Sequence, residues 1–224
     1  MARHAAVLAE RRLFVDVRTA LLHGGPPPGE GLAGLQGRTV YVMPVMMCAG
    51  RHVMRTLPAA LGGTERAGGA GPTLHFCRPL GLHPAIAGLV AARASGELAR
   101  QRWSPEQTNL LLAAHGSKTD PASRQAADLQ ATWLRARRLF GSVATAFLEE
   151  EPSLPAALAA LPGPLIVAGL FAAPGAHAGH DVTRMLADCR RRDVAYLGAI
   201  GADAAIPEII VKIVEAGAPG TLRR

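Results

Sequence analysis

The second half of this 224-residue chain repeats the first half, and this internal repeat limits the fold more than any other feature. Residues 11–14 recur as residues 137–140, an offset of 126 positions. At that offset nine of the 16 positions from 11 to 26 are identical, including the pairs Val17 and Val143, Thr19 and Thr145, Ala20 and Ala146, Leu22 and Leu148, and Pro26 and Pro152. Further along, Gly-Arg-His at 50–52 matches Gly-Ala-His at 175–177. Such self-similarity indicates two tandem structural units.

Apolar runs separated by amphipathic segments predict the elements of each unit. In the second unit we expect strands at 109–114, 143–148, 165–171 and 194–199, and helices at 121–140, 153–161, 181–192 and 205–216. In the first unit we expect the end of a helix at 2–12, a strand at 39–47 and a helix at 87–93. Short apolar strands between helices are typical of parallel sheets covered on both faces. The predicted fold is therefore α/β, with two tandem pseudo-symmetric doubly wound parallel-sheet lobes, at 1–100 and 105–224.

The two lobes differ at their starts. The second lobe opens with a strand that leads into His115-Gly-Ser117, and the first lobe has no counterpart of that strand or that histidine. Either the first lobe has lost its first strand, or the unit starts upstream of Met1, and the sequence leaves both open. The first lobe is therefore expected to carry a degenerate site. Its residues align with polar residues of the second lobe as follows: His23 with Glu149, His52 with His177, and Thr56 with Asp181.

The charge and composition exclude several classes of protein. Apolar residues make up 49% of the chain, too many for a disordered protein, and aromatic residues make up 4%, too few for a base-stacking platform. The net charge of +7 permits an anionic partner without naming one, and because the basic residues form no long run we expect no nucleic-acid-binding arm. We also expect no signal peptide and no membrane span. Three dispersed cysteines without a CxxC motif predict reduced thiols in a cytoplasmic protein.

Two histidines and a carboxylate follow strands of the second lobe. His115 ends the strand at 109–114, Glu149 follows the strand at 143–148, and His177 lies in a glycine-bracketed loop after the strand at 165–171. Because ligands of parallel α/β sheets bind at the carboxyl ends of strands, these side chains are expected to converge. Imidazole binds cobalt, nickel, iron and zinc, and it is also a base near neutral pH. The alternative is that each histidine only caps a helix or bonds to a backbone carbonyl.

Other motifs carry less information. Ser117 lacks the GxSxG pattern of a nucleophile, so we expect a helix N-cap or a polar contact to substrate. The glycines at 24–29 match neither GxGxxG nor a P-loop, and no organic cofactor is expected.

The motifs of the second lobe together resemble the sirohydrochlorin chelatases, the family of the cobaltochelatase CbiX and its ferrochelatase relatives. The resemblance rests on the segments at 110–117 and 147–149, on Gly-Leu-Phe-Ala-Ala-Pro-Gly-Ala-His at 169–177, and on 197–203. It implies that His115 and His177, with Glu149, bind the incoming divalent metal, and that the histidines take up pyrrole protons. Flanking residues complete the implied site: Ser117, Arg51, Arg55, Arg124 and Arg184 toward the substrate, and Asp181 and His180 behind His177.

The resemblance implies insertion of Co²⁺, or alternatively Fe²⁺, into sirohydrochlorin, with the metal as a substrate. Sirohydrochlorin is a polycarboxylate, so arginines in a cleft between the lobes would attract it. A monomer and a homodimer are both compatible with the sequence. Two other functions stay open: a metal carrier or sensor that has kept the histidines, and a phosphate- or nucleotide-binding protein that shares only the fold.

Overall fold

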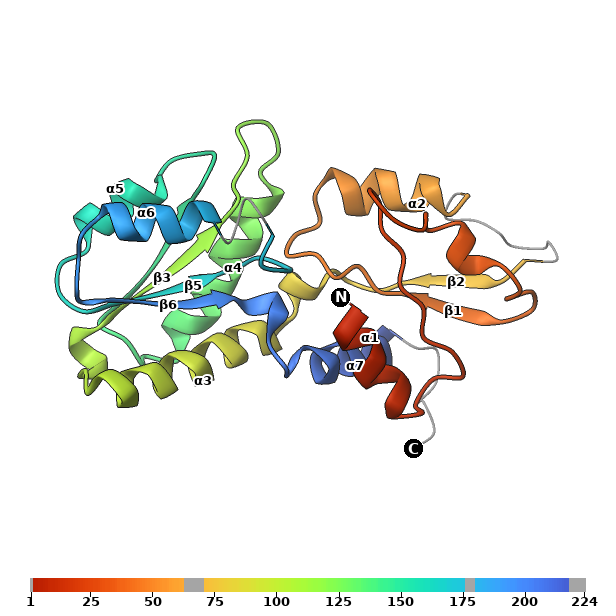
Figure 1. The fold of residues 1–224 in the computed structure, drawn as a ribbon, viewed down its shortest axis with the longest axis horizontal. Coiled ribbons are helices and arrows are strands. Elements are labelled where there is room, and N and C mark those ends of the chain that lie inside the picture. Colours follow the sequence, from red (N-terminus) through yellow and green to blue (C-terminus); the bar gives the residue numbers. More distant parts are fainter. Residues whose placement is uncertain (1, 63–70, 176–179, 218–224) are drawn as a thin grey trace.

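The structure, a computed structural model, describes residues 2–62, 71–175 and 180–217, which form two lobes side by side (Figure 1). The first lobe contains β1 (Thr39–Val42) and β2 (Thr73–Phe76), paired in parallel. The second lobe contains a four-stranded parallel sheet in the order β4 (Ser142–Phe147), β3 (Asn109–Ala114), β5 (Leu165–Gly169) and β6 (Val194–Ala199). The expected α/β fold with parallel sheets is confirmed. Within the described ranges, no helix is long and apolar enough to cross a bilayer.

Helices cover both faces of the second sheet. Leu110 and Leu112 of β3 belong to an apolar cluster with α3 (Pro84–Gln101) and α4 (Ala122–Ala136), whereas Leu111 packs with α5 (Leu154–Ala160) and α6 (Val182–Asp188). All three leucines are fully buried. Successive side chains of a strand point to opposite faces, so an uninterrupted apolar strand fills two cores at once. These two layers of helices position the strand ends that carry the site.

Two helices cross from one lobe to the other. The helix α3 follows the first sheet along the chain, yet it packs against β5, β6 and α4 of the second lobe. In return α7 (Ile206–Gly217) packs beside α1 (Ala2–Glu10) in the first lobe (Figure 1). The boundary expected near residues 97–107 separates the two sheets. The two helices are exchanged across it: α3 precedes the boundary but packs in the second lobe, and α7 follows it but packs in the first. One apolar cluster joins the lobes through Leu8, Val90, Leu110 and Ile210.

The internal repeat is visible in the turns that precede these two helices. The 3₁₀ turns Leu80–Leu82 and Ile200–Ala202 place Gly81 and Gly201 against the chain that follows β1 and β5 respectively. The Gly81 N–H donates to the Met46 carbonyl oxygen (3.0 Å), and the Gly201 N–H donates to that of Phe171 (2.9 Å). Nearby side chains then accept N–H groups at the start of each helix, with His83 Nδ1 before α3 and Asp203 Oδ1 before α7. The two units therefore share local structure as well as sequence.

Among its described residues, the first lobe has no counterpart of β3 or of β4. Its segment at 17–22 aligns with β4, but it forms no strand in the structure. In the second lobe β4 pairs only with β3, and the described part of the first lobe has no counterpart of β3. The segment at 17–22 therefore has no neighbour with which to form a ladder. The strand expected at 39–47 is also shorter, ending at Val42, because Pro44 has no N–H to donate.

Gly81 lies tightly against the chain that follows β1, beside the junction of the lobes. A Cβ atom there would lie 2.1 Å from the Met47 carbonyl oxygen. We therefore expect Gly81→Ala to lower the free energy of unfolding by roughly 2–4 kcal/mol, because the backbone must shift. Gly96→Ala is the control, since Gly96 lies on an exposed face of α3 with nothing within 4 Å.

In urea denaturation, Gly96→Ala should stabilise the protein by about 0.5–1 kcal/mol, as expected for an exposed helix position. Equal stabilities for Gly81→Ala and the wild type would contradict the close packing at the junction.

Candidate functional site

His115 and Glu149 lie together at the carboxyl edge of the second sheet. Ala114 of β3 pairs with Phe147 of β4, so β3 ends one residue before His115 and β4 ends two residues before Glu149. The His115 carbonyl oxygen accepts the N–H groups of Leu148 (3.0 Å) and Glu149 (2.9 Å). His115 Nδ1 lies 4.0 Å from Glu149 Oε1, and the two side chains are 51% and 64% exposed. Two metal-binding groups are therefore close together and accessible.

A third strand also contributes to the position of His115. Its ring lies edge-on to Phe171, with ring centroids 5.5 Å apart and an angle of 85° between the planes. Phe171 follows β5 and is buried. The imidazole is therefore positioned by the ends of β3, β4 and β5.

The chain turns sharply after His115 because the next residue is glycine. Gly116 has a φ of +73°, a conformation that side chains disfavour. A Cβ atom at Gly116 would lie 2.7 Å from Glu150 Cγ and 2.8 Å from Phe147 Cβ. The Gly116 N–H donates to Ser123 Oγ at the start of α4 (3.0 Å). Only glycine fits this turn without displacing its neighbours.

Ser117 shapes the loop between this turn and α4. Its Oγ accepts the N–H groups of Thr119 (3.2 Å) and Asp120 (3.1 Å). The helix α4 begins two residues later, after Pro121, without a side-chain cap. Ser117 therefore orders the loop and does not cap α4 itself.

Glu150 is an anchor that the sequence analysis missed. Its Oε1 accepts the Ser117 N–H (3.2 Å), and its Oε2 accepts two N–H groups of Arg124, at 2.9 and 3.1 Å. The Arg124 guanidinium also lies 4.4 Å from the centroid of the Phe147 ring and donates to the Glu151 carbonyl oxygen. Arg124, expected to face the substrate, is thus engaged within the protein. The three consecutive glutamates at 149–151 indicate that one carboxylate can face inward, but the sequence does not show that this is the middle one.

The loop after β1 contacts the loop after His115. The Arg51 N–H donates to Asp120 Oδ2 (3.2 Å), and Asp120 Oδ1 accepts the Ala122 N–H (3.0 Å). Asp120 thus connects the two lobes beside the site, a role the sequence analysis did not assign. Only the backbone of Arg51 makes this contact. Arg51 is an exposed residue, and so is Arg55 four residues later.

The second histidine motif is only partly described. His177 lies outside the described residues. His180 is exposed, and the Arg184 guanidinium donates to Asp181 Oδ1 at 3.3 Å. Arg184 is 69% exposed, so this ion pair leaves it accessible. Within the described ranges, no three His, Cys, Asp or Glu side chains are arranged to hold a metal ion.

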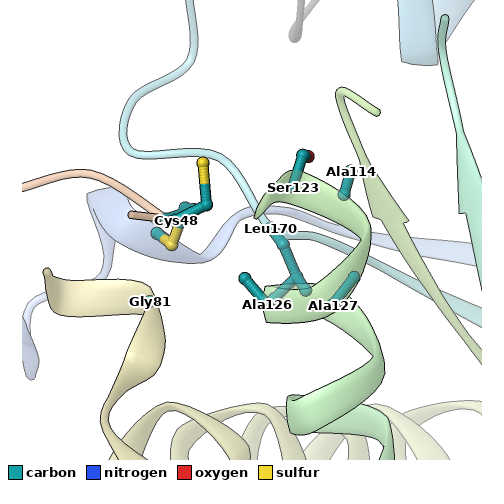
Figure 2. A pocket seen from close by; sticks show the side chains of 8 residues that line it. Cys48, Gly81, Ala114, Ser123, Ala126, Ala127 and Leu170 are labelled. Atoms are coloured by element: carbon teal, nitrogen blue, oxygen red, sulfur yellow. The ribbon is translucent and has the colours of Figure 1, made fainter. Parts of the chain in front are cut away.

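A small pocket lies between the lobes, behind the loop of His115. Figure 2 shows it between Cys48 and Gly81 of the first lobe and Ser123, Ala126 and Leu170 of the second. Its volume is about 10 Å³, enough for one water molecule but not for a macrocycle. Burial raises the pKa of the Cys48 thiol, and the Asp120 carboxylate raises it further. Both effects disfavour the thiolate form of Cys48.

Comparisons with known proteins agree on one family. The CbiX family model matches residues 1–97 and again 109–216. A curated relative from Halobacterium salinarum, named "Probable sirohydrochlorin cobaltochelatase", is 24% identical, covering 96% of this chain and 85% of its own. The solved structure of CbiX, described as the terminal enzyme for siroheme biosynthesis in denitrifying bacteria, has a TM-score of 0.80 and 27% identity, covering 96% of this chain and 90% of that one. SirB from Bacillus subtilis with Fe³⁺ also has a TM-score of 0.80, at 15% identity, covering 97% and 88%.

Because the family model matches nearly the whole chain in two copies, the protein belongs to the CbiX family of sirohydrochlorin chelatases. The family resemblance inferred from the sequence is confirmed. Enzymes of this kind handle cobalt or iron as a substrate, so the protein is a chelatase-like enzyme with two lobes.

Two adjacent glutamates should differ in how much they contribute to stability. Glu150→Ala leaves the Arg124 guanidinium and the Ser117 N–H without their acceptor, so we expect a loss of about 1–2 kcal/mol in the free energy of unfolding. Glu149→Ala removes an exposed side chain whose ionic contact among the described residues is the 4.0 Å one with His115, and should change that free energy by less than about 0.5 kcal/mol.

The free energy of unfolding of both variants is compared with that of the wild type by urea denaturation. Equal destabilisation by the two substitutions would mean that Glu150 does not anchor the turn.

Proposed function

We propose that this protein inserts a divalent metal ion into sirohydrochlorin, in the synthesis of cobalamin or siroheme. The observation that carries the proposal is the exposed pair of His115 and Glu149 at the carboxyl edge of the second sheet, 4.0 Å apart. His177, placed by sequence in the loop after β5, is proposed as the third ligand.

The pair is suited to a loosely held ion. Imidazole nitrogen and carboxylate oxygen each bind such an ion at about 2.0–2.2 Å, so the two atoms must approach to about 3.0–3.5 Å. The Glu149 side chain is 64% exposed, so its rotation can close the remaining gap. A site with few protein ligands keeps open positions, which the macrocycle nitrogens need in order to take the ion over.

The reaction also requires a base. A divalent ion replaces two pyrrole N–H protons, so two protons leave the macrocycle for each ion that enters. We assign this role to His115 and His177, because a histidine released by the departing metal has a lone pair available for a proton. The Phe171 ring fixes the orientation of His115 during this exchange.

The substrate carboxylates are proposed to bind the exposed arginines around the site. The residues proposed for this contact are Arg51 and Arg55 of the first lobe and Arg184 of the second, all of which are exposed. The guanidinium group binds carboxylates in a bidentate manner. Arg124 serves this binding indirectly, by holding Glu150 and the turn after His115. The Ser117 hydroxyl accepts two backbone N–H groups of its own loop. We propose that the exposed side of this loop contacts the substrate.

Cobalt is the ion that we favour, because the curated relative from Halobacterium salinarum is named a cobaltochelatase. Iron is the alternative, since the solved CbiX structure is described in terms of siroheme. We propose a cytoplasmic enzyme, monomeric or homodimeric, that uses no organic cofactor and binds neither nucleic acid nor membranes.

The proposal is tested by mixing the protein with sirohydrochlorin and either Co²⁺ or Fe²⁺ under anaerobic conditions. Insertion changes the absorption spectrum of the macrocycle, so initial rates can be followed directly. We expect faster insertion with Co²⁺ than with Fe²⁺. Binding of Co²⁺ without insertion of either metal would instead indicate a metal carrier.

A further inference from the structure

The first lobe contains a pair of histidines that the proposed reaction does not use. His23 and His52 lie 29 residues apart in the sequence, but their ring centroids are 5.6 Å apart, with an angle of 81° between the planes. Both residues are exposed. In the internal repeat they align with Glu149 and His177, two of the proposed metal ligands. The fold therefore brings together in the first lobe the positions that it is expected to bring together in the second.

The distance between the rings suits a shared metal ion. An ion bound by imidazole lies about 2.0–2.1 Å from the nitrogen, and therefore about 3.2 Å from the ring centroid. Two such rings at the tetrahedral angle have centroids about 5.2 Å apart, close to the observed 5.6 Å. Because both rings are exposed, they can rotate to direct one nitrogen each at a common point.

One member of the pair also neighbours a contact with the loop of the proposed insertion site. His52 directly follows Arg51, whose N–H bonds to Asp120 in the loop after His115 (3.2 Å). In Figure 1 the helical segment that begins at residue 52 lies on one side of the junction between the lobes, and the green loop that follows β3 lies on the other. An ion held by the first lobe would therefore lie beside the loop of the second site.

We infer that His23 and His52 form a second divalent metal site, with water completing the coordination. The ions it would take are those that prefer imidazole, such as Co²⁺, Ni²⁺ and Zn²⁺. The repeat places Thr56 where the second lobe has Asp181, so the first lobe lacks that carboxylate. A site of two neutral ligands binds and releases its ion readily, which is the property of a loading site. This last role, supplying the insertion site, rests on the proposed function; the metal binding itself does not.

The experiment measures metal binding without insertion, in a background where the second-lobe site is disabled. The double variant His115→Ala/His177→Ala is titrated with Co²⁺ alone by isothermal calorimetry. We expect one remaining site per chain. Adding His52→Ala, or separately His23→Gln, should weaken that site at least tenfold. His75→Phe is the matched control, because His75 stacks on Tyr41 within the same lobe and is not part of the pair.

Three results would overturn the inference: no binding by the double variant up to about 1 mM Co²⁺, binding unchanged by the added His52→Ala and His23→Gln substitutions, or equal weakening by His75→Phe. Circular dichroism of each variant establishes that it is folded. No step of this titration uses sirohydrochlorin. Its result can therefore be interpreted even if the protein does not catalyse insertion. The two hypotheses can therefore fail separately.

Discussion

Replacing His115 by alanine should lower the rate of metal insertion by roughly 10²–10⁴-fold, the range associated with loss of a positioned acid–base group. This is the largest effect that we expect from a single side chain. His115 is both a proposed metal ligand and a proposed proton acceptor, and it lies where three strands end. Because its side chain is 51% exposed, its removal should cost the fold little.

The matched control is His75→Phe, which keeps an aromatic ring on Tyr41 and changes no residue of the site. Both variants are compared with the wild type at saturating Co²⁺ and sirohydrochlorin. A rate for His115→Ala within about threefold of the wild type would contradict the assignment. His177→Ala is expected to match His115→Ala in its effect.

The second large effect is expected from Gly116→Ala, which changes no reactive group. The left-handed conformation alone disfavours alanine by about 1–2 kcal/mol, and overlap with Phe147 and Glu150 adds to that cost. We expect a total loss of roughly 2–4 kcal/mol in stability. Because the turn must shift, His115 should move relative to Glu149, and insertion should slow by about 100-fold, as for a displacement of about 1 Å.

Gly34→Ala separates the two causes. Gly34 has a similar φ of +75°, but nothing lies within 4 Å of its Cβ position. This variant should therefore lose only about 1–2 kcal/mol in urea denaturation and keep its insertion rate. Comparable activity losses in the two glycine variants would show that the tight packing around Gly116 is not what positions His115.

Much of the second lobe could be predicted because its signals are local. Four apolar strands between amphipathic helices are sufficient to specify a parallel sheet, and the observed strands begin and end within two residues of those expected. The exchange of α3 and α7 between lobes could not be predicted in this way. Each helix has an apolar face that suits either sheet, and only the three-dimensional path of the chain decides which sheet it covers.

The candidate site also has one part that the sequence predicts and another that depends on the three-dimensional structure. The placement of His115 and Glu149 at one edge follows from the geometry of parallel strands, which fixes where strand ends meet. The roles of Glu150 and Asp120 depend on contacts between side chains and distant backbone groups, such as the Ser117 and Arg51 N–H groups. No spacing in the sequence specifies such contacts. The repeat aligns His23 and His52 with Glu149 and His177, which led us to expect a degenerate site, and only the structure shows how close the two rings are.

Catalysis of metal insertion by this chain can be measured as the initial rate with sirohydrochlorin and Co²⁺. The spectrum of the macrocycle is followed with and without the protein, at equal metal concentration. We predict that the rate rises above the uncatalysed rate in proportion to protein concentration. An initial rate that is the same with and without the protein, for both Co²⁺ and Fe²⁺, would contradict the claim.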